Sequence, residues 1–107
     1  MSLEEQIQAY YFNIFDAKNI WYVHIPKSFY MKKRKSKLTY FPDCLACYNN
    51  KYYIREFGAK NCHTDRKSKQ MIYMQRIKEN APDVTDIKII LSLDAAEQDL
   101  KEIGIIH

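Results

Sequence analysis

The spacing of apolar residues near the start of the chain predicts an amphipathic helix. Ser2 followed by Glu5 fits a capping box, in which the two side chains satisfy free N–H groups at a helix start. Apolar side chains then recur at intervals of three and four residues, which predicts a helix over residues 3–17. Its expected buried face consists of Leu3, Ile7, Tyr10 or Tyr11, and Ile14.

Two more helices are predicted in the second half of the chain. Thr64 or Asp65 can cap a helix over roughly residues 66–80. Its buried face should comprise Met71, Met74, and Ile77 or Ile72. The acidic-alanine segment 94–97 should cap a short final helix, and Gly104 should end that helix, because glycine tolerates the left-handed conformation found there.

Segments rich in β-branched and aromatic residues predict four strands. Residues 20–25 form the first of these segments, and residues 41–48 and 51–57 form the two arms of a hairpin. Asn49-Asn50 at the hairpin tip can adopt the left-handed conformations that a tight turn requires. Residues 87–91 are almost continuously apolar, which predicts a central strand covered on both faces.

The resulting element order is αβββαβα, which predicts an α/β fold with a mixed central sheet flanked by helices. A chain of 107 residues is long enough for one domain, expected to span residues 1–107. No apolar run approaches the roughly 20 residues of a membrane span, and the N-terminus lacks the layout of a secretory signal. The odd number of cysteines, three, argues against a disulfide framework and indicates a reducing compartment. We therefore expect a cytoplasmic protein without a membrane partner.

The net charge of +4 is unevenly distributed. Every charged residue from position 27 to position 37 is cationic, so the rest of the chain is net acidic. The cationic residues are Lys27, Lys32, Lys33, Arg34, Lys35 and Lys37. Such a segment can neutralise phosphates without regard to base sequence, which predicts contact with nucleic acid. The alternative is a solvated loop that contributes only to solubility.

Two acidic residues on the predicted hairpin indicate a metal site. Asp43 lies on the first arm and Glu56 on the second. Carboxylates on adjacent strands can share Mg²⁺, which takes oxygen ligands and leaves other positions to water and phosphate. A metal so placed can activate water and neutralise the charge of a scissile phosphodiester. The structural alternative is that Pro42-Asp43 starts a strand and that Glu56 faces solvent.

The cysteines permit a second metal hypothesis. Cys44 and Cys47, together with Cys62-His63, have the composition of a Cys₃His zinc site. Residues three apart on a strand point to opposite faces, however, so the first two cysteines should not converge on one ion. We therefore expect buried thiols rather than a zinc site.

Several short motifs follow one another in a defined order. The first helix carries Glu4 and an Ile-Gln pair, Phe41-Pro42-Asp43 opens one hairpin arm, Glu56 lies on the other, and Gln70 opens the second helix. A strand and the basic segment separate the first helix from the hairpin. This order, over nearly the whole chain, resembles the PD-(D/E)xK nuclease superfamily and most closely its virus-type replication-repair nuclease (VRR-NUC) domains.

The resemblance implies a set of residue roles. Asp43, Glu56 and the backbone carbonyl of Phe57 would ligate Mg²⁺ or Mn²⁺. Glu4 would complete the acidic cluster, directly or through water, and Gln70 would orient the site. The implied activity is phosphodiester hydrolysis on branched or structured DNA, by a structure-selective endonuclease or junction resolvase of phage or mobile-element type, commonly a homodimer. Glu4 is also explained by the helix dipole alone, and Gln70 as a surface residue.

The chain departs from the family at one position. The family has a lysine two residues after the glutamate, where this chain has Gly58. That lysine would position the attacking water and stabilise the transition state, which glycine cannot do. Lys60 would lie on the same strand face and could replace it, provided that the strand continues. Otherwise the domain would be a catalytically inactive module that binds DNA or protein, for example a phage-encoded inhibitor of a host nucleic-acid enzyme. A third alternative is a small α/β interaction protein whose acidic pair has no function.

Overall fold

The computed structural model describes residues 1–25, 42–58 and 64–107, with residues 64–70 described by their backbone. These residues form three helices and a four-stranded mixed sheet, in the predicted order αβββαβα. The elements are α1 (Leu3–Ala17), β1 (Tyr22–His24), β2 (Cys44–Tyr48), β3 (Lys51–Phe57), α2 (Thr64–Asn80), β4 (Thr85–Ile90) and α3 (Leu93–Ile103). The predicted α/β class is confirmed.

The strands lie in the spatial order β1-β2-β3-β4. The pairs β1–β2 and β2–β3 are antiparallel. β4 pairs with β3 in parallel, and the chain reaches it through α2. The β2–β3 hairpin turns at Asn49 and Asn50, which have φ angles of 50° and 66°. This is the predicted left-handed turn.

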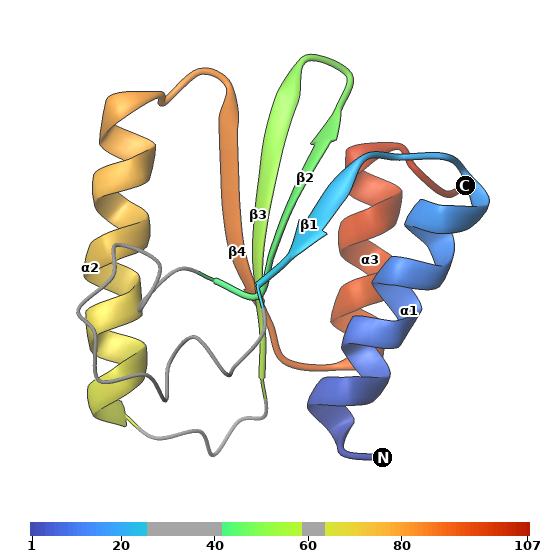
Figure 1. Ribbon diagram of the computed structural model, residues 1–107, viewed down its shortest axis with the longest axis horizontal. Helices are drawn as coiled ribbons and strands as arrows, with labels where there is room; N and C mark the ends of the chain where they lie inside the picture. The colour runs from blue at the N-terminus through green and yellow to red at the C-terminus, as the bar shows by residue number, and fades with distance from the viewer. Residues whose placement is uncertain (26–41, 59–63) are drawn as a thin grey trace.

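The prediction that residues 87–91 form a central strand is wrong, because β4 lies at an edge of the described sheet. Figure 1 shows α2 on one face of the sheet and α1 with α3 on the other. A strand between two helical layers buries side chains on both faces even when it has one strand neighbour. The continuous apolar sequence therefore indicated a strand with helices on both faces of the sheet, and not a strand with a neighbouring strand on each side.

Local capping signals set the helix ends. The Ser2 hydroxyl accepts a hydrogen bond from the Glu5 N–H at 3.1 Å and starts α1, as predicted. α3 begins earlier than expected, because the Ser92 hydroxyl accepts from the Ala95 N–H at 3.0 Å; the predicted cap within residues 94–97 is wrong. Gly104, with φ of 93°, ends α3 as predicted.

The core lies between the sheet and the helices α1 and α3. Ile7 and Tyr11 are buried there, as predicted, whereas Leu3 in the first turn of α1 is exposed. The other large residues of this core include Phe15, Tyr53, Phe57, Ile90, Leu100 and Ile105.

The predicted apolar face of α2 is only partly correct. Met74 is buried, but Met71 is 58% exposed and Ile72 is also exposed. α2 lies along the outer strand β4, so a narrow stripe of the helix is enough to cover it. No helix among the described residues combines the length and the hydrophobicity needed to cross a bilayer.

Candidate active site

The register of the hairpin brings the two predicted acidic residues together. Cys44 on β2 pairs with Arg55 on β3, and continuing this antiparallel register by one residue places Asp43 opposite Glu56. Residues that continue an antiparallel pair in this way point to the same face of the sheet. Both residues are buried, with exposed fractions of 2% for Asp43 and 4% for Glu56. The alternative in which Glu56 faces solvent is therefore wrong.

Backbone hydrogen bonds hold Asp43 in place at the start of β2. One carboxylate oxygen, Oδ2, accepts from the Phe57 N–H at 2.8 Å. The Asp43 carbonyl accepts from the Ile25 N–H, also at 2.8 Å. A carboxylate offers about four acceptor positions, so one backbone bond fixes its orientation and leaves capacity for a further ligand. Asp43 thus closes the end of the strand ladder whether or not it also binds a metal.

The oxygen donors at this end of the hairpin suit a hard divalent cation. In an extended strand the N–H and C=O of one residue point to the same side. Because the Phe57 N–H points to Asp43, the Phe57 carbonyl is also directed toward β2. Two carboxylates and a carbonyl fit Mg²⁺ or Mn²⁺, which is often bound by one or two carboxylates together with substrate phosphate and water.

The acidic pair lies where the parallel strands β3 and β4 end. Figure 1 shows that α1, α2 and α3 all begin at this end of the sheet. Helix N-termini carry partial positive charge, which favours anions nearby. Ligands of open α/β sheets commonly bind beyond the carboxyl ends of the strands. The location therefore suits a phosphate-containing ligand.

Glu4 lies in the first turn of α1 and is half-buried. Within residues 1–25, 42–58 and 64–107, no group of three His, Cys, Asp or Glu side chains is arranged to hold a metal ion. Glu4 is therefore not brought together with Asp43 and Glu56 as a third direct ligand. A role for Glu4 through water stays a prediction.

Gly58 continues the pairing of β3 rather than breaking it. Its N–H donates to the Ile90 carbonyl at 3.1 Å, and the residue is buried. By strand alternation, position 58 shares the face of Glu56. The family lysine would therefore sit beside the acidic pair, where this chain has no side chain.

The structure gives the backbone position of one further predicted site residue, Gln70. Gln70 belongs to α2, as predicted, and is described by its backbone. Lys60 lies outside the described residues, and so does the basic segment, which comprises Lys27, Lys32, Lys33, Arg34, Lys35 and Lys37.

A buried charge network on the opposite face of β3 was not predicted. Arg55 donates from Nε and Nη2 to the two carboxylate oxygens of Asp99, at 2.8 and 2.9 Å. The Tyr11 hydroxyl donates to Asp99 at 2.6 Å. The network thus joins β3 to α1 and α3 through a bidentate ion pair, the strongest common type of protein hydrogen bond.

Burial and hydrogen bonding shift the pKa of each residue in this network. Burial opposes ionisation of Asp99, but the hydrogen bonds and charge of Arg55 outweigh it and lower the pKa of that carboxyl. Burial likewise opposes the charged form of Arg55, and Asp99 outweighs it, so the pKa of Arg55 is raised. Burial, followed by the hydrogen bond to Asp99, raises the pKa of Tyr11 and keeps its hydroxyl protonated. Since residues 55 and 56 point to opposite faces, this network lies apart from the acidic pair.

The structure does not support a zinc site at the early cysteines. Cys44 pairs with Arg55 and Cys47 pairs with Tyr52, which places the two thiols on opposite faces of the sheet, as predicted. Burial raises the pKa of the Cys44 thiol to about 12, so this side chain is a protonated core residue. Cys62 and His63 lie outside the described residues.

The candidate site thus consists of two opposed, buried carboxylates and a backbone carbonyl at the carboxyl end of β3. Comparisons of the chain with models of protein families, with curated proteins and with solved structures found no match.

Proposed function

We propose that the protein is a metal-dependent DNA nuclease that hydrolyses phosphodiester bonds. The proposal specifies a structure-selective endonuclease or junction resolvase of phage or mobile-element type, with a PD-(D/E)xK fold of the VRR-NUC kind. The observation that carries it is the buried pair Asp43 and Glu56, set opposite each other at the carboxyl end of β3. The order αβββαβα and the mixed sheet support the same family resemblance.

Asp43, Glu56 and the Phe57 carbonyl would hold Mg²⁺ or Mn²⁺. The bound cation would activate water and neutralise the charge of the scissile phosphate. The chain contributes orientation, because the Phe57 N–H fixes the Asp43 carboxylate at 2.8 Å before any ligand arrives. It also contributes exclusion of water, because both carboxylates are almost fully buried, and electrostatic interactions are stronger in such surroundings.

The remaining roles belong to residues around the pair. Lys60 would position the attacking water and stabilise the charge that develops on the phosphate. Gln70 would orient the site from α2, and Glu4 would act through water. The basic segment, residues 27–37, would contact DNA phosphates, which gives selectivity for DNA shape rather than base sequence.

The proposal is tested by incubating labelled four-way junction, flap and duplex DNA with the protein and Mg²⁺, Mn²⁺ or EDTA. Wild-type protein should cut in the presence of metal, with preference for branched DNA. Asp43→Asn should lower the cleavage rate about a hundredfold or more, because it removes a charged ligand of the metal. Asparagine can still accept the Phe57 N–H, so thermal unfolding of this variant should change little.

Asp83→Asn is the matched control, because it makes the same chemical change at an exposed position in the turn between α2 and β4, at the opposite end of the sheet. It should cut like the wild type. Cleavage that persists in EDTA, or that survives Asp43→Asn unchanged, would exclude the proposed site.

The second candidate function is a catalytically inactive nuclease fold that binds DNA or protein, such as an inhibitor of a host nucleic-acid enzyme. Gly58 favours it, because position 58 has no side chain that could take the role of the family lysine. This candidate predicts no cleavage with any metal and a DNA or protein affinity that neither EDTA nor Asp43→Asn changes. Metal-dependent cleavage that is lost in Lys60→Ala would exclude it and assign the catalytic lysine.

A further inference from the structure

Two large aromatic side chains are exposed on the face of the sheet that carries the acidic pair. Residues an even number of positions apart on a strand share a face, so Tyr52 lies on the face of Glu56. Tyr52 pairs with Cys47 on β2, and the Cys47 N–H donates to the Trp21 carbonyl at 3.0 Å. Continuing the β1–β2 register by one residue places Trp21 opposite Cys47, on the same face. Trp21 is 61% exposed and Tyr52 is 48% exposed.

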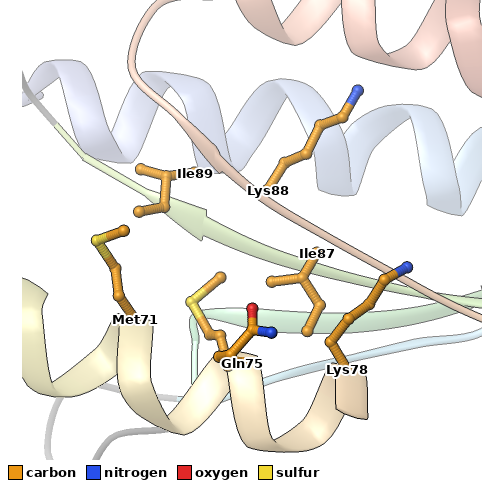
Figure 2. A pocket seen from close by; sticks show the side chains of 7 residues that line it. Met71, Gln75, Lys78, Ile87, Lys88 and Ile89 are labelled. Atoms are coloured by element: carbon orange, nitrogen blue, oxygen red, sulfur yellow. The ribbon is translucent and has the colours of Figure 1, made fainter. Parts of the chain in front are cut away.

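The helix on this face lies along β4 and not over the two rings. Figure 2 shows Ile87 and Ile89 of β4 directed toward Met71 of α2. Ile87 pairs with Ile54, which shares the face of both rings and is buried. The face is therefore covered near α2, whereas Trp21 and Tyr52 stay exposed.

A small side chain separates the two rings. Trp21, Cys47 and Tyr52 form one row across β1, β2 and β3, so two strand spacings, about 9.5 Å, separate the backbones that carry the rings. Neither ring makes an aromatic contact with another described residue. Both rings are therefore free to stack on a ligand.

A hollow of about 470 Å³ adjoins Tyr52 at the tip of the hairpin. Its lining includes Cys47 and Tyr52 and the polar turn residues Asn49, Asn50 and Lys51. This volume lies within the range of small-ligand sites, about 300–1,000 Å³. Lys51 is exposed and has no ion-pair partner among the described residues, so its ammonium is available to a phosphate.

These groups together suit an unpaired nucleotide. Exposed aromatic residues on a sheet stack on bases whose faces are free, and such bases occur in single strands. The asparagine amides can donate to and accept from the edge of a base, and the lysine can neutralise its phosphate. A protein partner could contact the same rings, but the cation and the two amides around the hollow favour a nucleotide.

The rings are within reach of the acidic pair along one strand. Tyr52 precedes Glu56 by four residues, which corresponds to about 13 Å along β3. A DNA strand covers this distance in roughly four nucleotides at the spacing of a duplex strand, and in fewer when it is extended. A strand bound at the rings can therefore continue along the same face to Asp43 and Glu56.

We propose that Trp21 and Tyr52 hold a single-stranded arm of the DNA substrate by stacking on its bases, while Lys51 contacts a phosphate. This inference rests on the proposed function and deepens it, because it specifies which part of a branched substrate the protein holds. It favours a flap, which has an unpaired arm, over a fully paired four-way junction.

The single tryptophan of the chain, Trp21, reports stacking directly through its fluorescence. Oligo(dT) and an abasic strand, each of about 12 nucleotides, carry the same phosphate charge, but only oligo(dT) has bases. In EDTA, which prevents cutting, oligo(dT) should quench the fluorescence of Trp21. The anisotropy of labelled strands should give a Kd at least about tenfold lower for oligo(dT) than for the abasic strand. Equal affinities, or no binding of either strand, would overturn the proposal.

Tyr52→Ala should raise the Kd for oligo(dT) about tenfold, because one stacking platform is lost. Tyr52→Phe keeps the ring and should bind like the wild type. Ile72→Ala is the control, because it truncates an equally exposed apolar residue on α2, outside the row and the hollow. An unchanged Kd in folded Tyr52→Ala would overturn the role of this ring. If that variant is unfolded by circular dichroism, the comparison of the two strands on the wild type decides.

The same measurements separate this inference from the proposed function. Binding is measured without metal, so Asp43→Asn should bind oligo(dT) as the wild type does. Metal-dependent cleavage together with equal affinity for both strands would overturn the stacking site alone. Base-dependent binding without cleavage in any metal would support the stacking site and overturn the proposed catalysis.

Discussion

Two neighbouring residues of β3 place charge on opposite faces of the sheet. Arg55 is paired within the fold, since both oxygens of Asp99 accept from its guanidinium. Glu56 lies on the other face of β3 and next to Asp43 across the hairpin. Opposite charges that are buried together stabilise each other, whereas two carboxylates in the same position attract a cation. The first arrangement is structural, and the second is the arrangement expected of a binding site.

The ion pair of Arg55 and Asp99 predicts a specific dependence of stability on pH. Because folding lowers the pKa of Asp99 below its ordinary value of 3.8, its contribution is present above that value and is lost as pH falls through the lowered pKa. At pH 7, Asp99→Asn should reduce the free energy of unfolding by about 3 kcal/mol, because it removes the buried, bidentate counterion of the Arg55 guanidinium and leaves only the partly exposed Asp86 beside it.

Urea denaturation of the wild type and of Asp99→Asn between pH 2 and pH 7 measures this effect. The difference between the two proteins should shrink below pH 3.8. The Asp83→Asn variant, at an exposed position in the turn between α2 and β4, should follow the wild type throughout. A difference between wild type and Asp99→Asn that stays constant over the whole range would contradict the assignment.

At the scale of elements, α3 continues the chain from β4 and places Asp99 against Arg55. Its first turn follows the end of β4, and its second turn brings Asp99 to Arg55. The Ser92 cap sets the start of the helix and therefore the position of both. A change at the cap should consequently weaken the fold without touching any buried contact.

We predict that Ser92→Ala lowers the free energy of unfolding by about 1 kcal/mol, because the Ala95 N–H loses its acceptor. Ser92→Gly should cost only a few tenths of a kcal/mol, since glycine is well tolerated at this position. Urea midpoints of the two variants provide the comparison. Equal losses would show that the hydroxyl does not act as the cap.

At the scale of the whole molecule, the uneven charge distribution predicts how DNA would bind. Neutralising Lys32, Lys33, Arg34 and Lys35 together should weaken DNA binding and flatten its salt dependence. Each lost phosphate contact should reduce the slope of log K against log salt by about 0.9 on duplex DNA. Titrations at several salt concentrations measure this slope.

The control neutralises Lys18 and Lys101, which are exposed and lie outside the basic segment. This variant should keep the wild-type slope. An unchanged slope in the four-residue variant would exclude the basic segment from the interface.

How much of the fold could be predicted depended on how local each signal was. Ser2, the Asn49-Asn50 turn and Gly104 act on their immediate neighbours, and all three were predicted correctly. The approach of Asp43 to Glu56 followed from the same short turn. The edge position of β4 depends on which strands pair, and a continuous apolar segment does not contain that information.

The Arg55–Asp99 pair shows why other contacts could not be predicted. The two residues are 44 positions apart, on a strand and a helix with no shared periodicity. A sequence pattern marks each as a charge within an apolar element, but only the three-dimensional arrangement shows that the charges meet. Lys60 and the basic segment lie outside the described residues, so their predicted roles are left to experiment.

The wide sequence separation within this network also sets an order for folding during synthesis. Tyr11 and Asp99, which share a hydrogen bond, are 88 positions apart. A ribosome adding about 5–20 residues per second needs roughly 2–9 seconds to progress from Arg55 to Asp99. During that interval the hairpin can form while its arginine still lacks Asp99. The buried ion pair is therefore completed late, and until α3 has left the ribosome Arg55 is either hydrated or paired with Asp86 alone.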